Sequence, residues 1–331
     1  MRKVHFGVIG TNFITDRVIA GGREDGRFEV VAVCSRSGER GQAFAAKYGI
    51  PHVFTSLEAM ASSPLVDAVY IASPNACHAD QSVLCMQRGK HVLCEKPLAS
   101  NAAEVRRMIK TATDCRVVLM EAMKPTLTPG FRALQAALPE IGVVRQYFSC
   151  FCQYSSRYDK LKEGVVLNAF RPELGNGAVM DIGVYTLYPM VVLFGRPRMI
   201  QASSIKLCTG VDGHGCVNFT CDGGLNATVL YSKIVDSRLP TEIQGENGRI
   251  TVDRIQHIGR VTLAGRDGSV KDLYTRTERD EYYYEVAEFI DLIQSGRSES
   301  TVNSLENSLI TIEITDEIRR QAGVVFPADA T

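Results

Sequence analysis

The tripeptide Glu95-Lys96-Pro97 follows the apolar run His91–Cys94 and brings an acid, an amine and a proline together in succession. Such a run is typical of a buried strand, and the proline marks the point where an extended segment stops. A lysine beside a carboxylate at a strand end can donate a charged hydrogen bond to a developing alkoxide, or depress the pKa of a neighbouring hydroxyl. The alternative is a solvated surface turn, because charged side chains are mostly exposed.

Asp181 and Tyr185 form a second candidate for chemistry, far along the chain from this lysine. Because they are four residues apart, both side chains face the same way if a helix begins here, and an acid is favourable in a first helical turn. A free tyrosine has a pKa near ~10, so it needs a cation such as Lys96 to exchange protons near neutral pH. A helix cap at Asp181 and a core aromatic at Tyr185 are the alternatives.

The elements that must position Lys96 alternate between strands and helices. Apolar runs predict strands at residues 4–10, 28–34, 52–54, 68–72, 91–94 and 117–120. Helical patterns predict helices near residues 14–19, 37–48, 57–61, 78–89 and 101–113. A strand, a glycine turn and a helix in this order are the first unit of a dinucleotide-binding fold, and the alternation favours an α/β class with a parallel sheet.

The turn after the first strand should carry the glycine fingerprint G-x-G-x-x-G/A of dinucleotide-binding proteins. This chain has Gly10, Thr11, Asn12, Phe13 and Ile14, so only the first glycine is present. Asparagine tolerates a left-handed backbone, and its amide could donate to a phosphate, yet its side chain crowds the approach of the coenzyme. We expect these five residues to contact the pyrophosphate, although the motif alone is a weak signal.

The end of the second predicted strand indicates which coenzyme is bound. NAD-preferring proteins place a carboxylate here for the ribose 2′-hydroxyl, whereas a nearby arginine accommodates a 2′-phosphate. The chain has Ser35 and Arg36 at this point, with Ser37 and Arg40 close behind, and it has no acid there. We therefore expect NADP, with NAD possible, held by charge-assisted hydrogen bonds from Ser35 and Arg36. A solvated arginine at a loop tip is the alternative.

The fourth predicted strand ends in Ser73, Pro74 and Asn75, and His78 follows near the start of the next helix. In open α/β sheets, ligands bind at the edge formed by the carboxyl ends of the strands. We expect these residues to line the coenzyme pocket, together with Glu95 on the nicotinamide side.

Beyond Glu121–Pro125 the pattern changes to closely spaced strands with few helices between them. Strands are predicted at residues 143–154, 199–207, 215–221, 225–234, 241–244, 249–252 and 260–264, and helices at 129–138, 281–294 and 304–322. Such a run of strands predicts an α+β domain with a large, open, mainly antiparallel or mixed sheet. We place this domain at residues 123–331, and its last helix could pack back on the first domain.

Composition excludes several classes of partner. The 331 residues carry 37 basic and 37 acidic side chains, so no net field favours nucleic acid or an anionic membrane. No uninterrupted apolar run of membrane-spanning length and no signal peptide is evident, and ten cysteines then indicate reduced thiols in the cytoplasm. The spacing of Cys208, His214, Cys216 and Cys221 matches no common zinc pattern, so we expect no metal.

The pattern Ser-Pro-Asn-x-x-His at residues 73–78, followed by residues 89–97 ending in Glu-Lys-Pro, resembles the signature of the Gfo/Idh/MocA oxidoreductases. The element Asp-Ile-Gly-x-Tyr at residues 181–185 is similar to that of the dimeric dihydrodiol dehydrogenase branch. The resemblance implies a Rossmann domain over residues 1–122 and a lysine at position 96 that assists hydride transfer. It also implies that the open sheet face of the second domain forms a homodimer or homotetramer.

The implied activity is an NADP-dependent transfer of hydride between the nicotinamide and a secondary alcohol or hemiacetal carbon of a sugar, polyol or cyclic diol. Tyr185 would exchange the hydroxyl proton, Lys96 would steady the substrate oxygen, and Asp181 would orient the lysine or bind substrate. Candidate substrate contacts, all in the polar segment before Asp181, are Arg157, Tyr158 and Arg171. The alternatives are an NADP-binding regulator without catalysis and a biliverdin-reductase-like enzyme that reduces a double bond.

Overall fold

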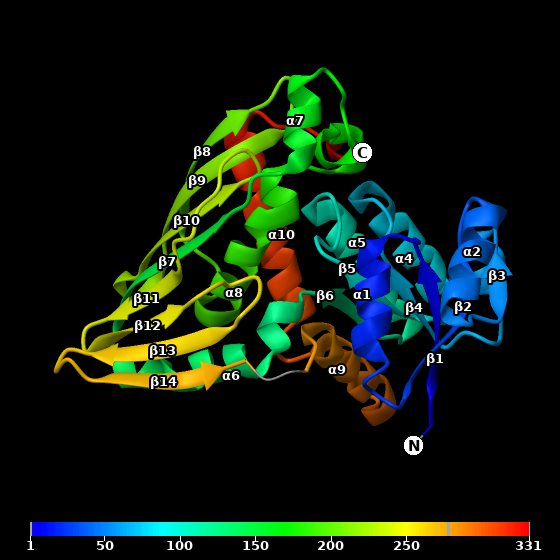
Figure 1. Cartoon of the computed structure of the whole chain (residues 1–331), viewed down its shortest axis with the longest axis horizontal. Coiled ribbons are helices and arrows are strands. Elements are labelled where there is room, and N and C mark those ends of the chain that lie inside the picture. Colours follow the sequence, from blue (N-terminus) through cyan, green and yellow to red (C-terminus); the bar gives the residue numbers. More distant parts are fainter. Residues whose placement is uncertain (1, 277–278, 331) are drawn as a thin grey trace. The chain divides into compact units, whose positions relative to one another are not determined.

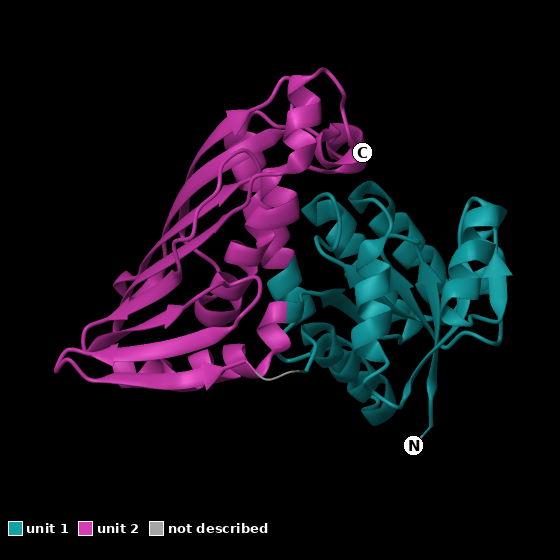
Figure 2. Ribbon diagram, viewed as in Figure 1, with its two compact units in different colours: residues 1–124, 279–308 teal, residues 125–278, 309–331 magenta. Residues whose placement is uncertain are grey.

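The computed structural model describes residues 2–276 and 279–330, and Figure 1 shows the order of its elements. Contacts within the chain divide it into two compact units (Figure 2). Unit 1 comprises residues 1–124 and 279–308, and unit 2 comprises residues 125–278 and 309–331. Residues 279–308, which follow the second domain's strands in the sequence, thus belong to unit 1 by their contacts.

Unit 1 contains a parallel six-stranded sheet in the order β3-β2-β1-β4-β5-β6. Its strands are β1 (Val4–Ile9), β2 (Phe28–Cys34), β3 (His52–Phe54), β4 (Ala68–Ile71), β5 (His91–Glu95) and β6 (Leu119–Ala122). Its main helices are α1 (Phe13–Gly22), α2 (Gly38–Tyr48), α3 (Leu57–Ala61), α4 (His78–Gln87), α5 (Ala102–Cys115) and α9 (Glu281–Ser295). This strand order is that of a Rossmann fold, which confirms the predicted class, and it reverses between β1 and β4.

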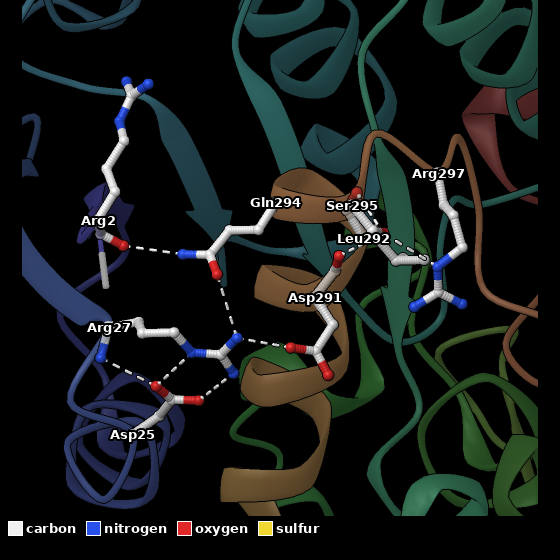
Figure 3. A network of polar contacts seen from close by, with 8 residues as sticks. All are labelled: Arg2, Asp25, Arg27, Asp291, Leu292, Gln294, Ser295 and Arg297. Atoms are coloured by element: carbon white, nitrogen blue, oxygen red, sulfur yellow. Dashed lines mark hydrogen bonds and ion pairs between the residues drawn. The ribbon is translucent and has the colours of Figure 1, made fainter.

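Helix α9 belongs to unit 1 because it packs closely on α1. A Cβ atom added to Gly21 of α1 would lie 2.8 Å from the Cβ of Tyr282, so the glycine permits this approach. The guanidinium of Arg27 donates to Asp291 at 2.6 Å and to Gln294 at 3.3 Å (Figure 3). Both partners lie on α9, so polar bonds and close packing together fix this helix beside the start of β2.

Unit 2 contains an eight-stranded sheet in the order β14-β13-β12-β11-β7-β10-β9-β8. Its strands are β7 (Val144–Cys152), β8 (Met199–Lys206), β9 (Asp212–Thr220), β10 (Asn226–Ser232), β11 (Thr241–Gly245), β12 (Gly248–Val252), β13 (Arg260–Gly265) and β14 (Val270–Thr275). Strand β10 pairs with β7 in parallel, and the other neighbours pair antiparallel. The predicted open, mainly antiparallel sheet is confirmed, and β14 is a strand that the sequence did not reveal.

The helices of unit 2 are α6 (Pro129–Ala137), α7 (Ser156–Lys162), α8 (Val184–Phe194) and most of α10 (Leu305–Ala322). The phenol of Tyr147 on β7 donates to the carbonyl of Thr186 at 2.9 Å and so fixes α8 to the sheet. The helical stretch Pro172–Phe194 is long and apolar enough, by length and composition, to cross a membrane. Because 72% of its most apolar part is buried inside the molecule, it has the burial expected of a core helix.

Candidate active site

The turn between β1 and α1 requires its one glycine. Gly10 has a φ of 99°, and a Cβ atom there would lie 2.5 Å from the carbonyl oxygen of Ala72. Thr15 lies in the first turn of α1, and its hydroxyl donates to the carbonyl of Gly10 at 2.9 Å, which stabilises the connection between β1 and α1. The end of β1 and the residue after β4 therefore meet closely at the point where the strand order reverses.

Asn12 occupies the position of the second fingerprint glycine, and its side chain bonds to the protein. Its backbone is extended (φ −102°, ψ 176°), so the left-handed conformation that the sequence allowed is not used. Its Oδ1 accepts from the amides of Ile14 and Thr15 at 2.9 and 3.2 Å, and its Nδ2 donates to the carbonyl of Ala72 at 2.7 Å. Asn12 thus caps α1 and joins the turn to β4, and a phosphate contact from its amide stays a prediction.

The turn after β2 presents an exposed arginine on a loop that is held by internal hydrogen bonds. The hydroxyl of Ser35 donates to the carbonyl of Ser37 at 2.9 Å, and the hydroxyl of Ser37 accepts from the amide of Arg40 at 3.3 Å to cap α2. Arg36 is exposed. Burial raises the pKa of the Cys77 thiol, and the positive charge of Arg36 opposes this rise. Since Cys77 follows β4, Arg36 acts on the carboxyl-end edge of the sheet, where a coenzyme is expected.

His78 joins the loops that follow β4 and β5. It is buried, and its ring nitrogens lie 2.9 Å from the carbonyl oxygens of Pro97 and Ser73. Burial lowers the pKa of its imidazole. The Lys96–Pro97 peptide bond is cis. Because both ring nitrogens face backbone carbonyls, we infer that His78 positions the lysine's turn, while direct coenzyme contact stays a prediction.

Lys96 is partly exposed, whereas the acid before it points into the core of unit 1. The phenol of buried Tyr70 donates to Glu95 Oε1 at 2.6 Å, and burial raises the pKa of Glu95. Burial also raises the pKa of Glu121, on neighbouring β6, to about 7. The charge of Lys96 opposes both shifts. The charge of Lys96 therefore acts on two buried carboxyl groups of unit 1.

In unit 2, Asp181 and Tyr185 are presented by a mostly buried helical segment. A π-helical turn, Val179–Gly183, leads directly into α8. From residue 178 to residue 191, Asp181 and Tyr185 are the two partly exposed residues, and all others are buried. The ring of Phe151 packs edge-on against Tyr185 with centroids 5.8 Å apart. Both residues of the predicted pair are thus partly exposed on an otherwise buried stretch of an apolar helix.

Lys233 is a charged neighbour of this pair that the sequence analysis did not identify. Its ammonium pairs with the carboxylate of Asp181 and lies 5.5 Å from the ring centroid of Phe170. The partners are 52 residues apart in the sequence, so no local spacing reveals them. The available signal was a lysine directly after a strand, β10, which is the same arrangement as Lys96 after β5.

The three predicted substrate contacts differ in their surroundings. Tyr158 packs against Phe170 with centroids 6.1 Å apart, so it belongs to the same cluster as Lys233. Arg157 is exposed on α7. Arg171 is exposed, donates to the carbonyl of Val166 at 3.4 Å and lies 3.5 Å from Glu173. Of the three, Tyr158 is the one that contacts the surroundings of Asp181.

Within residues 2–276 and 279–330, no group of three or more His, Cys, Asp or Glu side chains is arranged to hold a metal ion. Among the residues described above, Lys96 and Arg36 are cations, Tyr185 is a phenol and Asp181 is a carboxylate. Such groups suit proton exchange and the binding of an anionic coenzyme.

Comparisons with known proteins agree with this chemistry. The family model described as "Oxidoreductase family, NAD-binding Rossmann fold" matches residues 4–123, and the Gfo/Idh/MocA C-terminal domain model matches residues 136–251. A scyllo-inositol 2-dehydrogenase (NADP(+)) of Bacillus subtilis is 49% identical over 98% of this chain and 99% of its own length. A trans-1,2-dihydrobenzene-1,2-diol dehydrogenase of Danio rerio is 32% identical over 91% of each chain.

Solved structures share the fold at lower identity. A 3-ketoreductase from Actinomadura kijaniata, in complex with NADP and TDP-benzene, is 24% identical with a TM-score of 0.85, covering 97% of this chain and 98% of that one. An aldose-aldose oxidoreductase from Caulobacter crescentus is 20% identical with a TM-score of 0.86 at the same coverage. Two family models that together match more than half of the chain, and a relative 49% identical over nearly its full length, show that this chain belongs to the Gfo/Idh/MocA family of oxidoreductases.

Proposed function

We propose that this protein is an NADP-dependent dehydrogenase that oxidises a ring CH–OH group of a cyclic polyol, with scyllo-inositol as the first candidate substrate. The observation that carries the proposal is the 49% identity, over 98% of the chain, to the scyllo-inositol 2-dehydrogenase of Bacillus subtilis. Trans-dihydrodiols are the second candidate class, because dihydrodiol dehydrogenases are about as long and up to 32% identical.

The residues at the carboxyl-end edge of unit 1 fit an NADP molecule. When bound, this coenzyme supplies the carbon that accepts or returns the hydride. Gly10 lets the turn lie close against the carbonyl of Ala72, and exposed Arg36 offers a cation to the 2′-phosphate. We propose that the coenzyme is held by Gly10–Ile14, Ser35, Arg36, Ser73–Asn75 and Lys96.

The proposed proton chemistry uses Tyr185, Lys96 and Asp181. In the oxidative direction, the Tyr185 oxygen accepts the proton from the oxygen of the substrate hydroxyl, while the hydride leaves the carbon that bears this hydroxyl. Reduction reverses both transfers. The cation of Lys96 stabilises the negative charge on the substrate oxygen, and Asp181 accepts a hydrogen bond from substrate. The apolar surroundings of Tyr185, including Phe151, strengthen these interactions by lowering the local dielectric constant.

A substrate screen tests the proposal. Formation of reduced nicotinamide is followed by absorbance with scyllo-inositol, myo-inositol, aldoses and trans-dihydrodiols, with NADP and NAD in parallel. We expect the highest kcat/KM with a cyclic polyol and NADP. Turnover of biliverdin alone, or coenzyme binding without turnover of any alcohol, would replace the proposal by one of the two alternative functions.

Assembly and location are also proposed. Met199 and Ile205, on one face of β8, are 49% and 53% exposed, and burying such side chains favours contact between copies of the sheet. We propose a homodimer or homotetramer in the cytoplasm, and all ten cysteines are free, as expected for a reducing compartment. Light scattering of the purified protein measures the assembly, and a monomeric mass would contradict it.

A further inference from the structure

Lys233 is one of the most deeply buried charges in unit 2. It follows β10 directly, and 5% of its side chain is exposed. Its backbone amide donates to the carbonyl of Gly213 at 2.8 Å, so the residue is fixed to the neighbouring strand β9. A buried ammonium is costly unless opposite charges and hydrogen bonds compensate it. The identity of these partners therefore indicates what the lysine does.

The first partner is Asp181, whose side chain is 36% exposed and pairs with the lysine through Oδ2. The second is Asp212, which is buried and accepts from the amides of Ala178 and Val179 at 3.0 and 2.8 Å. Burial raises the pKa of Asp212 to about 6, and the charge of Lys233 opposes that rise. Lys233 thus forms an ion pair with Asp181 on the surface of the helix, and its charge also acts on Asp212, which binds the first amides of the helix.

Aromatic rings complete the surroundings of this lysine. Phe170 lies against the ammonium at 5.5 Å, a cation–π contact, and packs in turn on Tyr158. These rings separate the lysine from solvent and limit its possible positions. A carboxylate that is paired with such a fixed cation loses most of its own rotational freedom, whereas an unpaired carboxylate at 36% exposure would turn toward water.

We propose that Lys233 is a positioning residue for the reaction: it holds the Asp181 carboxylate in the one orientation that serves the substrate. The inference rests on the proposed function, because it gives Asp181 a role at the substrate. A purely structural lysine would stabilise the turn around Asp181 and leave turnover unchanged in any variant that folds. The two roles therefore predict different effects of Lys233 variants on kcat. They also predict a different dependence of these effects on whether Asp181 is present.

The test compares Lys233→Met, Lys233→Arg, Asp181→Asn and the double variant, using whichever polyol or diol the wild type oxidises. Lys206→Met is the control, because Lys206 is an exposed lysine of the same unit that donates to the carbonyl of Gly323 at 3.1 Å. Coenzyme affinity, measured by reduced-nicotinamide fluorescence, and the unfolding temperature report on folding. If Lys233→Met does not fold, Lys233→Gln replaces it in the test, because glutamine keeps a hydrogen-bond donor and removes the charge.

We expect Lys233→Met to lower kcat on the order of 100-fold with coenzyme affinity unchanged, as for other losses of orientation at a reacting group. Lys233→Arg should recover most of that loss, and Lys206→Met should match the wild type. In the Asp181→Asn background, Lys233→Met should lower kcat further by less than about threefold, because the interaction between the two side chains is already gone.

Near-normal kcat in Lys233→Met, or losses that multiply in the double variant, would overturn the inference. Full activity of Asp181→Asn would overturn it as well, since no carboxylate then needs positioning, while the proposed dehydrogenase activity would stand. A wild-type enzyme that oxidises no polyol or diol would instead refute the proposed function, and the inference with it.

Discussion

Replacement of Asn12 tests whether this residue, in place of a fingerprint glycine, stabilises the coenzyme turn. Asn12→Ala removes the cap on the amides of Ile14 and Thr15, which costs about 1 kcal/mol. It also removes the hydrogen bond to the carbonyl of Ala72, which costs about 1 kcal/mol more. Asn12→Asp keeps the cap and places an oxygen against the carbonyl of Ala72, which it repels, but its charge is favourable at the N-terminus of α1. The expected order of stability is therefore wild type, Asp, Ala.

Coenzyme affinity should follow a different order. A carboxylate at position 12 lies where the anionic pyrophosphate is expected, so Asn12→Asp should bind reduced NADP more weakly than Asn12→Ala despite being more stable. Stability is measured by urea unfolding with circular dichroism, since the chain has no tryptophan, and affinity by nicotinamide fluorescence. Ser56→Ala, which removes the cap of α3, is the control: it should cost about 1 kcal/mol and leave affinity unchanged.

The result that would refute this reasoning is an Asn12→Ala variant as stable as the wild type. The bonds of Asn12 would then contribute nothing, and its side chain would only obstruct the coenzyme. Equal affinities of the Ala and Asp variants would show that the pyrophosphate does not lie at this turn.

Three further predictions concern unit 1. Arg36→Ala should weaken NADP binding roughly 10- to 100-fold in a fluorescence titration, through loss of charged hydrogen bonds, and leave NAD nearly unchanged; equal losses would contradict the 2′-phosphate role. The folded-state pKa of Glu121 is raised from 4.5 to about 7, so the folded protein favours the protonated carboxyl group. Protonated Glu121 therefore contributes about 3 kcal/mol to the free energy of unfolding below pH 4.5, and this contribution is lost as the pH rises through 7. Glu121→Gln should therefore flatten the unfolding free energy between pH 5 and 8, and an unchanged slope would place the titration elsewhere. Gly21→Val should destabilise the protein by about 1–3 kcal/mol, because the new side chain clashes with Tyr282. Gly26→Ala is the control and should change the stability little, because no atom lies within 4 Å of the added Cβ atom. Similar unfolding temperatures of the two variants would contradict the close packing of α9 on α1.

Much of the fold could be predicted because local patterns carry it. The strand Phe28–Cys34 and the helix Leu57–Ala61 have the predicted bounds, since buried parallel strands are continuously apolar and amphipathic helices are periodic. Strand β14 was missed because four of its six residues are exposed and charged side chains interrupt its alternation. The parallel pairing of β10 with β7 is a long-range choice that no local pattern specifies.

The sequence singles out proposed site residues where they lie in one segment, and it does not reveal contacts that depend on distant partners. Lys96 and the Asp181–Tyr185 pair stand out by type and spacing. The bonds of Asn12 to Ala72 and of Asp181 to Lys233 join residues 60 and 52 positions apart, so they arise only from the folded chain. The same holds for His78, whose motif position suggested a coenzyme contact and whose ring nitrogens face two backbone carbonyls.

The central claim is that Tyr185 exchanges the proton of a polyol hydroxyl in an NADP-dependent oxidation. Its most direct test is the rate of NADPH formation from scyllo-inositol by the wild type and by Tyr185→Phe, which keeps the ring packed against Phe151 and removes only the hydroxyl. The account predicts turnover by the wild type and a loss of at least about 100-fold in kcat in the variant, with coenzyme affinity intact. A Tyr185→Phe enzyme that keeps most of its turnover number would contradict it.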